Sequence, residues 1–491
     1  MSSRTSAEVR RGLKHPVIDA DGHWLEIFPI FFDYIREVAG PAVLERYRGG
    51  LGSRYQAWYR ATPAERMRNR MRRPPFWGAP TDTTDRAAAM VPSLYRQKLD
   101  DWGFDVAVMF PSLGFTLGRD VTDPEMIAAI IRAYNTMAVD MFRDCSDRLI
   151  PVGVVSLVDP KEAIAQLEHA HSIGLKLVMM GGSLPRAIEA DAQWQPDPAR
   201  RRVYVDGLGL DNAHDYDPVW RRFVELKMPV ATHVGSMGWP DRSSPTNFVA
   251  NHVGHFAQAH HLFARSLFLG GVTQRFPDLN FAFLEGGVGW GCNLLADLIG
   301  HWEKRNVRFM QERLNPARLD LGALKTLVAK HTQGHPRFEG RLDEILANYL
   351  DAVEYGVSQA DLAARDAGLE DDFRHVRLDS AADIKRLFGG NFYFGCEADD
   401  PMTAVAFDKR LGLNLKPILG SDISHFDVVD AAEVLEEAWE LVDHGLLNED
   451  DFREFTFTNA VRLFCGMNPG FFDGTRIEAE ARRAVAALKQ G

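Results

Sequence analysis

The sequence predicts an α/β fold, namely a (β/α)8 TIM barrel that carries two mainly helical insertions. Two observations lead to this prediction: eight short apolar runs of strand character recur along the chain, and helix-like stretches separate them. Alternating strands and helices imply parallel pairing through right-handed crossovers, and eight such units close into a barrel. A chain of 491 residues is long enough for one barrel domain with insertions.

The eight expected strands mostly lack polar–apolar alternation, as expected of parallel strands that are covered on both faces. Helix start signals such as Asp159-Pro160 and Asp217-Pro218 lie between them. In chain order, the expected strands are residues 16–21, 105–110, 150–156, 175–180, 229–233, 281–285, 391–395 and 417–422. We therefore interpret residues 1–491 as a single barrel domain.

Two stretches exceed what a barrel needs. Residues 24–100 follow the first expected strand and contain a basic, aromatic segment, residues 46–77. We interpret this segment as a helix and loop that pack on the barrel or on a sister subunit. The alternative is a lid over the active site, because the segment follows the C-terminal end of a strand. Residues 303–390, between the sixth and seventh strands, are expected to form several helices with acidic faces.

Composition excludes several classes of function. Lys and Arg number 56 against 68 Asp and Glu, and the resulting net charge of −12 disfavours nucleic acid as a partner. Four cysteines without a C-x-x-C pair indicate neither a disulfide framework nor a thiolate zinc site. There is no apolar run of about 18 residues and no signal-peptide pattern. We therefore expect a cytoplasmic homo-oligomer, most simply a dimer, that acts on a small molecule without membrane contact.

Polar residues at the ends of the expected strands form the candidate active site, because barrel enzymes act where their strands end. Histidine and carboxylate are suitable ligands for a divalent cation. The residues are Asp21 and His23 at the first strand, His233 at the fifth, Glu285 at the sixth and Asp422 at the eighth. Asp21 and His23 are two residues apart, so an extended backbone presents both on one face. We predict one divalent metal ion, zinc or manganese.

Several motifs, in order along the chain, resemble those of a known family. Residues 16–23, PVIDADGH, are similar to the first-strand I-D-x-H-x-H motif of the amidohydrolase superfamily, in its amidohydrolase-related (aminocarboxymuconate-semialdehyde-decarboxylase-like) branch. Further motifs of that branch resemble residues 231–233 (ATH), 270–279 (GGVTQRFPDL), 420–425 (GSDISH) and 459–460 (NA). The resemblance implies that Asp21, His23, His233 and Asp422 bind the metal and that Asp422 also accepts a proton.

Two departures from the family pattern bear on the reaction. Asp21 replaces the first histidine of H-x-H, which favours manganese without excluding zinc. Glu285 stands where the decarboxylases of the branch carry a catalytic histidine. We therefore predict a metal-dependent hydrolase of a C–N, ester or C–C bond in a small cyclic or aromatic carboxylate, with Asp422 and Glu285 as catalytic residues. The alternatives are a nonoxidative decarboxylase, or carboxy-lyase, of an aromatic acid and a catalytically silent ligand-binding barrel.

Two further histidines are candidate substrate-binding residues. His425 lies three residues after Asp422, close enough to the strand end to touch the substrate or to hold a metal ligand in place. His255 is the candidate within a histidine-rich segment. The other histidines there, His252, His260 and His261, are interpreted as packing or surface residues because of their helical spacing.

Overall fold

The structure is a computed structural model of the whole chain. It describes residues 4–50, 53–75, 78–112, 114, 123–182, 184–188, 203–235, 243–315, 318–347 and 371–488. The chain forms two compact units, of which the first comprises Met1–Ala296 and Ala382–Gly491 and the second Asp297–Ala381. All the described strands belong to the first unit.

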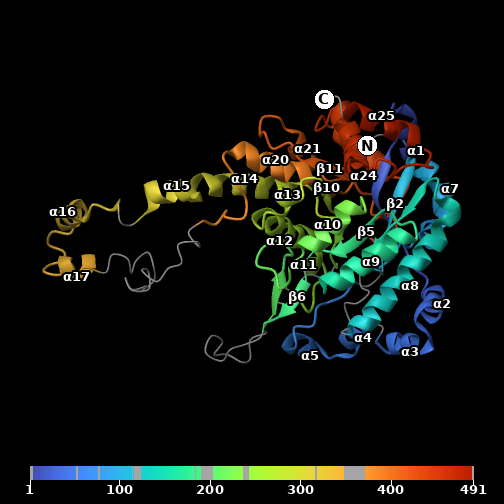
Figure 1. Cartoon of the computed structure of the whole chain (residues 1–491), viewed down its shortest axis with the longest axis horizontal. Coiled ribbons are helices and arrows are strands. Elements are labelled where there is room, and N and C mark those ends of the chain that lie inside the picture. Colours follow the sequence, from blue (N-terminus) through green and yellow to red (C-terminus); the bar gives the residue numbers. More distant parts are fainter. Residues whose placement is uncertain are drawn as a thin grey trace. The chain divides into compact units, whose positions relative to one another are not determined.

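Parallel strands form the wall of the barrel in the first unit (Figure 1). A three-stranded sheet contains β1 (Ile18–Trp24), β2 (Val106–Pro111) and β3 (Leu149–Pro151). A six-stranded sheet contains β4 (Gly153–Val154), β5 (Val178–Gly181), β8 (Val230–His233), β9 (Phe281–Phe283), β10 (Phe392–Cys396) and β11 (Lys416–Leu419). Every pairing within these two sheets is parallel.

The two sheets are continuous through β3 and β4, which only Val152 separates. The Val152 amide donates to the Met109 carbonyl at 3.1 Å, whereas the next amide, Gly153, donates to Leu177 at 3.0 Å. The backbone thus leaves one sheet and enters the other within two residues. The predicted barrel is confirmed, and its third strand is divided into β3 and β4.

A short antiparallel hairpin, β6 (Leu184–Ala187) with β7 (Val203–Asp206), follows β5 and was not expected from the sequence. Leu184-Pro185-Arg186-Ala187 contains one large apolar side chain, so it lacks the apolar run that indicates a buried strand. A largely buried ion pair joins the two strands of the hairpin instead: Arg186 Nε in β6 lies 2.6 Å from an Asp206 carboxylate oxygen in β7.

Helices separate the strands and cover the barrel (Figure 1). Between β1 and β2 lie α2 (Phe28–Ala39), α3 (Pro41–Gly50), α4 (Ser53–Arg60), α5 (Pro63–Arg68), α6 (Thr83–Met90) and α7 (Pro92–Trp102), so the described part of the first expected insertion is largely helical. The remaining helices of the first unit are α1 (Ser6–Gly12), α8 (Pro124–Phe142), α9 (Pro160–Ser172), α10 (Asp217–Glu225), α11 (Val249–His252), α12 (His255–Leu269), α13 (Val272–Arg275), α21 (Thr403–Phe407), α22 (Val434–Asp443), α23 (Glu449–Arg453), α24 (Asn459–Met467) and α25 (Glu478–Leu488). A 3-10 turn, Arg143–Cys145, and a π-helical turn, Glu454–Thr458, extend α8 and precede α24.

Helices begin at both expected start signals, but only Asp159 acts as a cap; Asp217 is the first residue of α10, and its carboxylate pairs with Arg275. Asp159 caps α9, because its side chain accepts a hydrogen bond from the Glu162 amide at 2.9 Å, and Pro160 occupies the first helical turn. Asp123 caps α8 in the same way, before Pro124. These caps satisfy amides that have no partner within the helix, so the helices begin where the local sequence specifies.

The second unit is described by α15 (Val307–Phe309), a π-helical turn at Met310–Leu314, α16 (Leu321–His331) and α17 (Leu342–Ala347). These helices contain no buried residue. Helix α14 (Gly289–Arg305) leads into the unit, and α20 (Ala381–Asn391), which buries Ile384, Leu387 and Phe388, leads out of it. The expected insertion, residues 303–390, therefore includes a helix that packs within the first unit.

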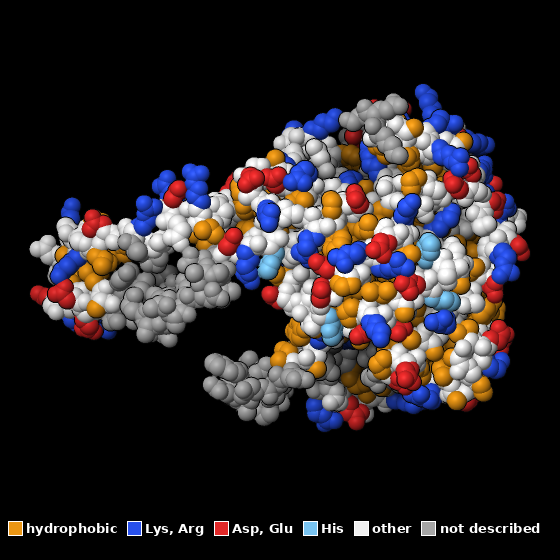
Figure 2. Space-filling view, in the orientation of Figure 1, with side chains coloured by type: hydrophobic (Ala, Val, Ile, Leu, Met, Phe, Trp, Pro, Cys, Tyr) orange, Lys and Arg blue, Asp and Glu red, His pale blue; other side chains and the backbone are white. Residues whose placement is uncertain are grey.

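Charged side chains of both signs are interspersed over the visible face of the molecule (Figure 2). The net charge of −12 is thus not gathered into one acidic field on that face. Among the residues that the structure describes, no helix has the length and apolar character needed to cross a membrane.

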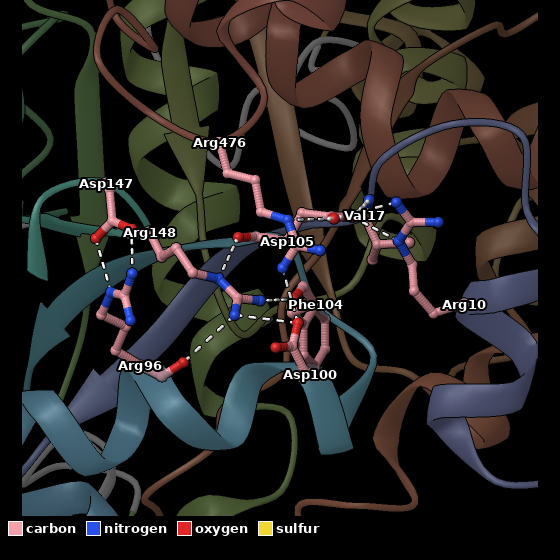
Figure 3. A network of polar contacts seen from close by, with 9 residues as sticks. All are labelled: Arg10, Val17, Arg96, Asp100, Phe104, Asp105, Asp147, Arg148 and Arg476. Carbon is pink, nitrogen blue, oxygen red and sulfur yellow. Dashed lines mark hydrogen bonds and ion pairs between the residues drawn. The ribbon is translucent and has the colours of Figure 1, made fainter.

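A buried arginine joins the elements that precede the first three strands (Figure 3). Arg148 donates from Nε to the Asp105 carbonyl at 3.0 Å and pairs with the Asp100 carboxylate at 3.1 Å. The Asp105 carboxylate in turn accepts from Arg10 Nε at 2.6 Å and from the Val17 amide at 2.8 Å. This network connects the chain just before β1, β2 and β3 at the N-terminal end of the barrel.

Replacing Arg148 with alanine is expected to lower the free energy of unfolding by about 3 kcal/mol, because it leaves buried carbonyl groups without donors. Urea unfolding measures the loss. Arg96→Ala is the matched control, since its pair with Asp147 is 42% and 43% exposed and is expected to contribute less than about 1 kcal/mol. Equal losses in the two variants would contradict a special role for the buried residue.

Candidate active site and metal centre

The four predicted metal ligands lie at the C-terminal ends of their strands, in two groups of clustered ligand atoms that share His23. One group is Asp21, His23 and His233, and the other is His23, Glu285, Asp422 and His425. Asp21 and His23 belong to β1, His233 is the last residue of β8, and Asp422 follows β11. Asp21 Oδ1 lies 2.9 Å from His233 Nε2 and 3.4 Å from His23 Nε2. Asp422 Oδ1 lies 3.3 Å from His23 Nε2. All four residues are buried, with at most 8% of their surface exposed.

These separations match those between ligands that share one cation. With bonds of about 2.1 Å, ligand atoms at octahedral or tetrahedral angles lie about 3.0 to 3.4 Å apart. Both ring nitrogens of His23 are buried without a hydrogen-bond partner among the described residues, which is costly unless another group satisfies one of them. Two imidazoles and two carboxylates form a donor set that suits zinc or manganese. The residues therefore fit a divalent cation.

Glu285 follows β9 and contacts the same cluster. Its Oε2 lies 3.0 Å from His233 Nδ1, and its Oε1 lies 3.7 Å from His425 Nδ1 and 3.8 Å from His23 Nε2. His233 Nε2 faces Asp21, so Nδ1 is the nitrogen that can donate to Glu285. A carboxylate on the second nitrogen of a metal-binding histidine orients the ring and raises its basicity.

The backbone is strained at both carboxylates that follow strand ends. Glu285 has φ 59° and Asp422 has φ 51°, in the left-handed region that side chains other than glycine rarely adopt. Such conformations cost free energy and persist where the surrounding structure imposes them, as is common at functional sites. They direct the two side chains toward the histidines at the mouth of the barrel.

The two predicted substrate-binding histidines occupy different positions. His425 Nδ1 lies 2.7 Å from Asp422 Oδ1, and its ring centroid is 3.9 Å from that of His23. His425 thus belongs to the cluster. His255 begins α12 and is 6% exposed, and it is not a member of either group of clustered ligand atoms among the described residues.

The buried carboxylates of the cluster raise the pKa of two of its histidines, His233 and His425. Burial opposes ionisation of Asp21, but His233 and then His23 hold its pKa well below the usual range. Burial likewise opposes protonation of His233, yet the nearby carboxylates, Asp21 foremost, keep its pKa well above the usual value. For His425, burial is outweighed by Asp422, and the pKa rises to about 9. Burial raises the pKa of Asp422, whereas burial and the neighbouring His425 lower that of His23.

Aromatic side chains line the chain near His425. Phe426 lies 5.9 Å from Phe248 and 6.1 Å from His252, measured between ring centroids. His252 Nε2 also lies 3.6 Å from an Asp427 carboxylate oxygen. Phe426 directly follows His425 in the chain, so these partly exposed rings form a wall beside that histidine.

The basic segment, residues 46–77, contacts the chain that follows β8. Trp58 Nε1 donates to the Pro245 carbonyl at 3.2 Å, and Arg70 Nη2 donates to the Ser243 carbonyl at 3.1 Å. Because His233 ends β8, the described part of the segment lies against the connection between His233 and α11. Packing on the barrel and a lid remain alternatives for its role.

Sequence reasoning did not single out Asp19 or Ser421, whose side chains hydrogen-bond at 2.6 Å beneath the cluster. A signal was available, because Asp19 shares the strand alternation of Asp21 and His23. Gly22 is required here: a Cβ at that position would lie 2.5 Å from Asp19 Oδ2 and 2.9 Å from the Tyr95 hydroxyl.

Comparisons with known proteins identify the family and the fold of the chain. The profile of the amidohydrolase family matches residues 18–391. The crystal structure of an amidohydrolase from Mycobacterium avium subsp. paratuberculosis K-10 is similar at a TM-score of 0.51, with 18% identity over 92% of this chain and 100% of that chain. No curated protein matches the chain.

Two further solved structures are similar at lower scores. They are 2,6-dihydroxybenzoate decarboxylase from Rhizobium, with 14% identity, coverage of 92% and 98% and a TM-score of 0.49, and the dihydroxybenzoic acid decarboxylase from Polaromonas sp. JS666 with bound manganese and 2-nitroresorcinol, with 12% identity, coverage of 92% and 97% and a TM-score of 0.49. The similarity to the amidohydrolase from Mycobacterium shows the fold, whereas the family profile covers most of the chain. The resemblance found in the motifs is thereby confirmed: the chain belongs to the amidohydrolase family, whose members are hydrolases or decarboxylases.

Proposed function

We propose that this protein is a metal-dependent hydrolase that cleaves a C–N, ester or C–C bond in a small cyclic or aromatic carboxylate. The observation that carries the proposal is a series of close ligand atoms at the strand ends: Asp21 lies 2.9 Å from His233 and 3.4 Å from His23, and His23 lies 3.3 Å from Asp422. One divalent cation held there, zinc or manganese, supplies an acidified water and a polarised substrate carbonyl.

Asp422 is the group that moves the proton in this proposal. Its carboxylate is buried beside the cluster, and Oδ1 lies 2.7 Å from His425 Nδ1. A carboxylate in this position accepts a proton from the attacking water and returns it to the leaving group. His425 Nδ1 is close enough to Asp422 Oδ1 to share that proton, and we assign His425 to substrate contact as well.

Glu285 supports hydrolysis over decarboxylation. A decarboxylase must deliver a proton to the carbon that loses carbon dioxide, which suits a histidine near neutral pH. The Glu285 carboxylate instead lies 3.0 Å from His233 Nδ1 and is the hydrogen-bond acceptor in that pair. Glu285 orients His233 with Oε2 and directs Oε1 toward His425 and His23, where a nucleophilic water is needed.

The wall of rings beside His425 supports a substrate with a flat ring. Phe248, His252 and Phe426 are partly exposed and lie within 6.1 Å of one another by ring centroids. Aromatic rings attract one another in offset or edge-to-face arrangements, so the wall offers a surface for a cyclic or aromatic group. The carboxylate on the substrate stays a prediction from the sequence.

The test is turnover in ¹⁸O-water by the manganese- or zinc-loaded protein, with esters and amides of cyclic and aromatic acids, each supplied with and without a second carboxylate. Hydrolysis is expected to place one label in the new carboxylate or hydroxyl of the product, as mass spectrometry detects. Release of carbon dioxide with no label in the organic product would establish the decarboxylase instead. Metal binding without any turnover would favour the silent ligand-binding barrel.

A further inference from the structure

The first and last strands of the barrel meet at a seam that has no regular ladder, although the structure describes both strands in full. β1 and β11 lie at the outer edges of their two sheets. Two backbone hydrogen bonds join the segments, from the Asp422 amide to the Asp21 carbonyl at 3.0 Å and from the His23 amide to the Ile423 carbonyl at 3.0 Å. Three of the four candidate metal ligands therefore lie on the two sides of this seam.

A single buried carboxylate, that of Asp19, bridges the seam. Its Oδ1 accepts from the Asp21 amide at 3.1 Å and from the Ser421 amide at 3.0 Å. Its Oδ2 accepts from the Ser421 hydroxyl at 2.6 Å, and the Ser421 oxygen accepts from the Ile423 amide at 3.1 Å. Asp19 thus binds the backbone amide of the ligand Asp21 on one side of the seam and, on the other, that of Ser421, which directly precedes the ligand Asp422.

Asp19 has no cation to compensate its charge among the described residues. It is 0% exposed, and the charged group that acts on it is another carboxylate, Asp21. A buried carboxylate costs free energy unless it is paired or fully hydrogen-bonded, so an apolar residue would be favoured here if packing alone mattered. Three hydrogen-bond donors compensate the Asp19 carboxylate instead: the Asp21 amide, the Ser421 amide and the Ser421 hydroxyl. These hydrogen bonds, and not packing, account for a carboxylate at this position.

The backbone around Asp19 is shaped to bring the carboxylate under the site. The pairing of β1 with β2 shifts register between Asp19 and Gly22, which is the signature of a β-bulge. At Gly22 any side chain would collide with Asp19 Oδ2, because a Cβ would lie only 2.5 Å away. The bulge and the glycine together allow the Asp19 carboxylate to lie beneath the Asp21 turn.

We propose that Asp19 is a positioning residue that sets the separation between the carboxylate ligands Asp21 and Asp422. It acts through the Asp21 and Ser421 backbones, and it touches neither the cation nor the substrate. The inference rests on the proposed metal site. It adds that the affinity and geometry of that site depend on a carboxylate outside the ligand set.

The test measures metal binding by isothermal titration of the metal-free full chain with Mn²⁺, together with the visible absorption spectrum of the Co²⁺-loaded chain. Asp19→Ala is expected to weaken the Mn²⁺ Kd about 10- to 100-fold and to change the Co²⁺ bands, because orienting partners of ligands have effects of this size. Asp19→Asn keeps an oxygen that can accept from both amides, so it is expected to restore part of the affinity. Ser421→Ala removes one bond and provides the milder variant if Asp19→Ala does not fold.

Asn135→Ala is the matched control. Asn135 is 0% exposed, and its side chain also binds a strand backbone, donating to the Val154 carbonyl at 3.1 Å and accepting from the Val154 amide at 2.7 Å. It lies outside the ligand cluster, so it is expected to lower thermal stability while leaving the Mn²⁺ Kd and the Co²⁺ bands unchanged.

The outcomes separate this inference from the proposed function. The positioning role would be overturned if Asp19→Ala and Ser421→Ala both kept the wild-type Mn²⁺ affinity and Co²⁺ spectrum. It would also be overturned if Asn135→Ala weakened Mn²⁺ binding as much as they do. Neither result would contradict the metal site of the wild-type chain. A wild-type chain that binds no divalent metal would instead overturn the metal site on which the proposed function depends. Weaker binding confined to the seam variants supports the inference.

Discussion

The double variant His23→Ala, His233→Ala is expected to lose its bound metal and, with it, all detectable turnover. The two imidazoles come from the C-terminal ends of two different strands, β1 and β8, and each lies within 3.4 Å of the Asp21 carboxylate. Without them two carboxylates remain, too few to hold a cation against water and buffer. Elemental analysis of purified protein is expected to show metal per chain reduced at least about tenfold, the scale at which even orienting partners affect affinity.

A histidine outside the cluster controls for the loss of imidazole itself. His15 is half-buried and hydrogen-bonds to Thr456 at 3.1 Å, away from the ligands, so His15→Ala is expected to retain the wild-type metal content. If the double variant kept the wild-type amount of metal, the proposed centre would be wrong and the cation would have to lie elsewhere.

Asp422→Asn is expected to lower kcat about 10²- to 10⁴-fold, the usual effect of losing one general base. The amide keeps the shape of the side chain and an oxygen that can remain a ligand, but it cannot accept the proton. Metal content is therefore expected to stay partly in place while turnover collapses. Steady-state kinetics with parallel elemental analysis distinguish the two effects.

Asp399→Asn is the control for removing a carboxylate in the same region. Asp399 is exposed and follows β10, and it is not a member of either group of clustered ligand atoms among the described residues. Its replacement is expected to change kcat less than about threefold, as is usual for surface substitutions. Activity of Asp422→Asn within the same range would show that the proton goes to another group.

Local patterns were sufficient for the strands and for most of the candidate centre. Apolar runs predicted each barrel strand to within a few residues, because a strand covered on both faces needs little beyond continuous apolar side chains. Strand alternation placed Asp21 and His23 on one face, and the structure brings both to the cluster at 3.4 Å. The strand ends likewise identified His233 and Asp422.

Local patterns were insufficient where contacts cross the barrel. His255 and His425 were both predicted to be neighbours of the substrate, yet His425 lies 2.7 Å from Asp422 whereas His255 is buried at the start of α12. The hairpin of β6 and β7 escaped notice because β6 contains a single large apolar side chain and β7 has only three strand-forming residues. The spacing of residues along the chain does not show which side of a helix faces the C-terminal end of the barrel.

The sequence by itself determined the barrel, the family and the residue types at each strand end, since periodicity, apolar runs and motifs are properties of neighbours in the chain. Only the tertiary structure decided that Glu285 accepts from His233, and that Asp19 joins the first strand to the segment after the last. Those partners are far apart in sequence, 402 residues in the case of Asp19 and Ser421. Their contact exists because closing the barrel brings its first and last strands together, and no local pattern encodes that distance.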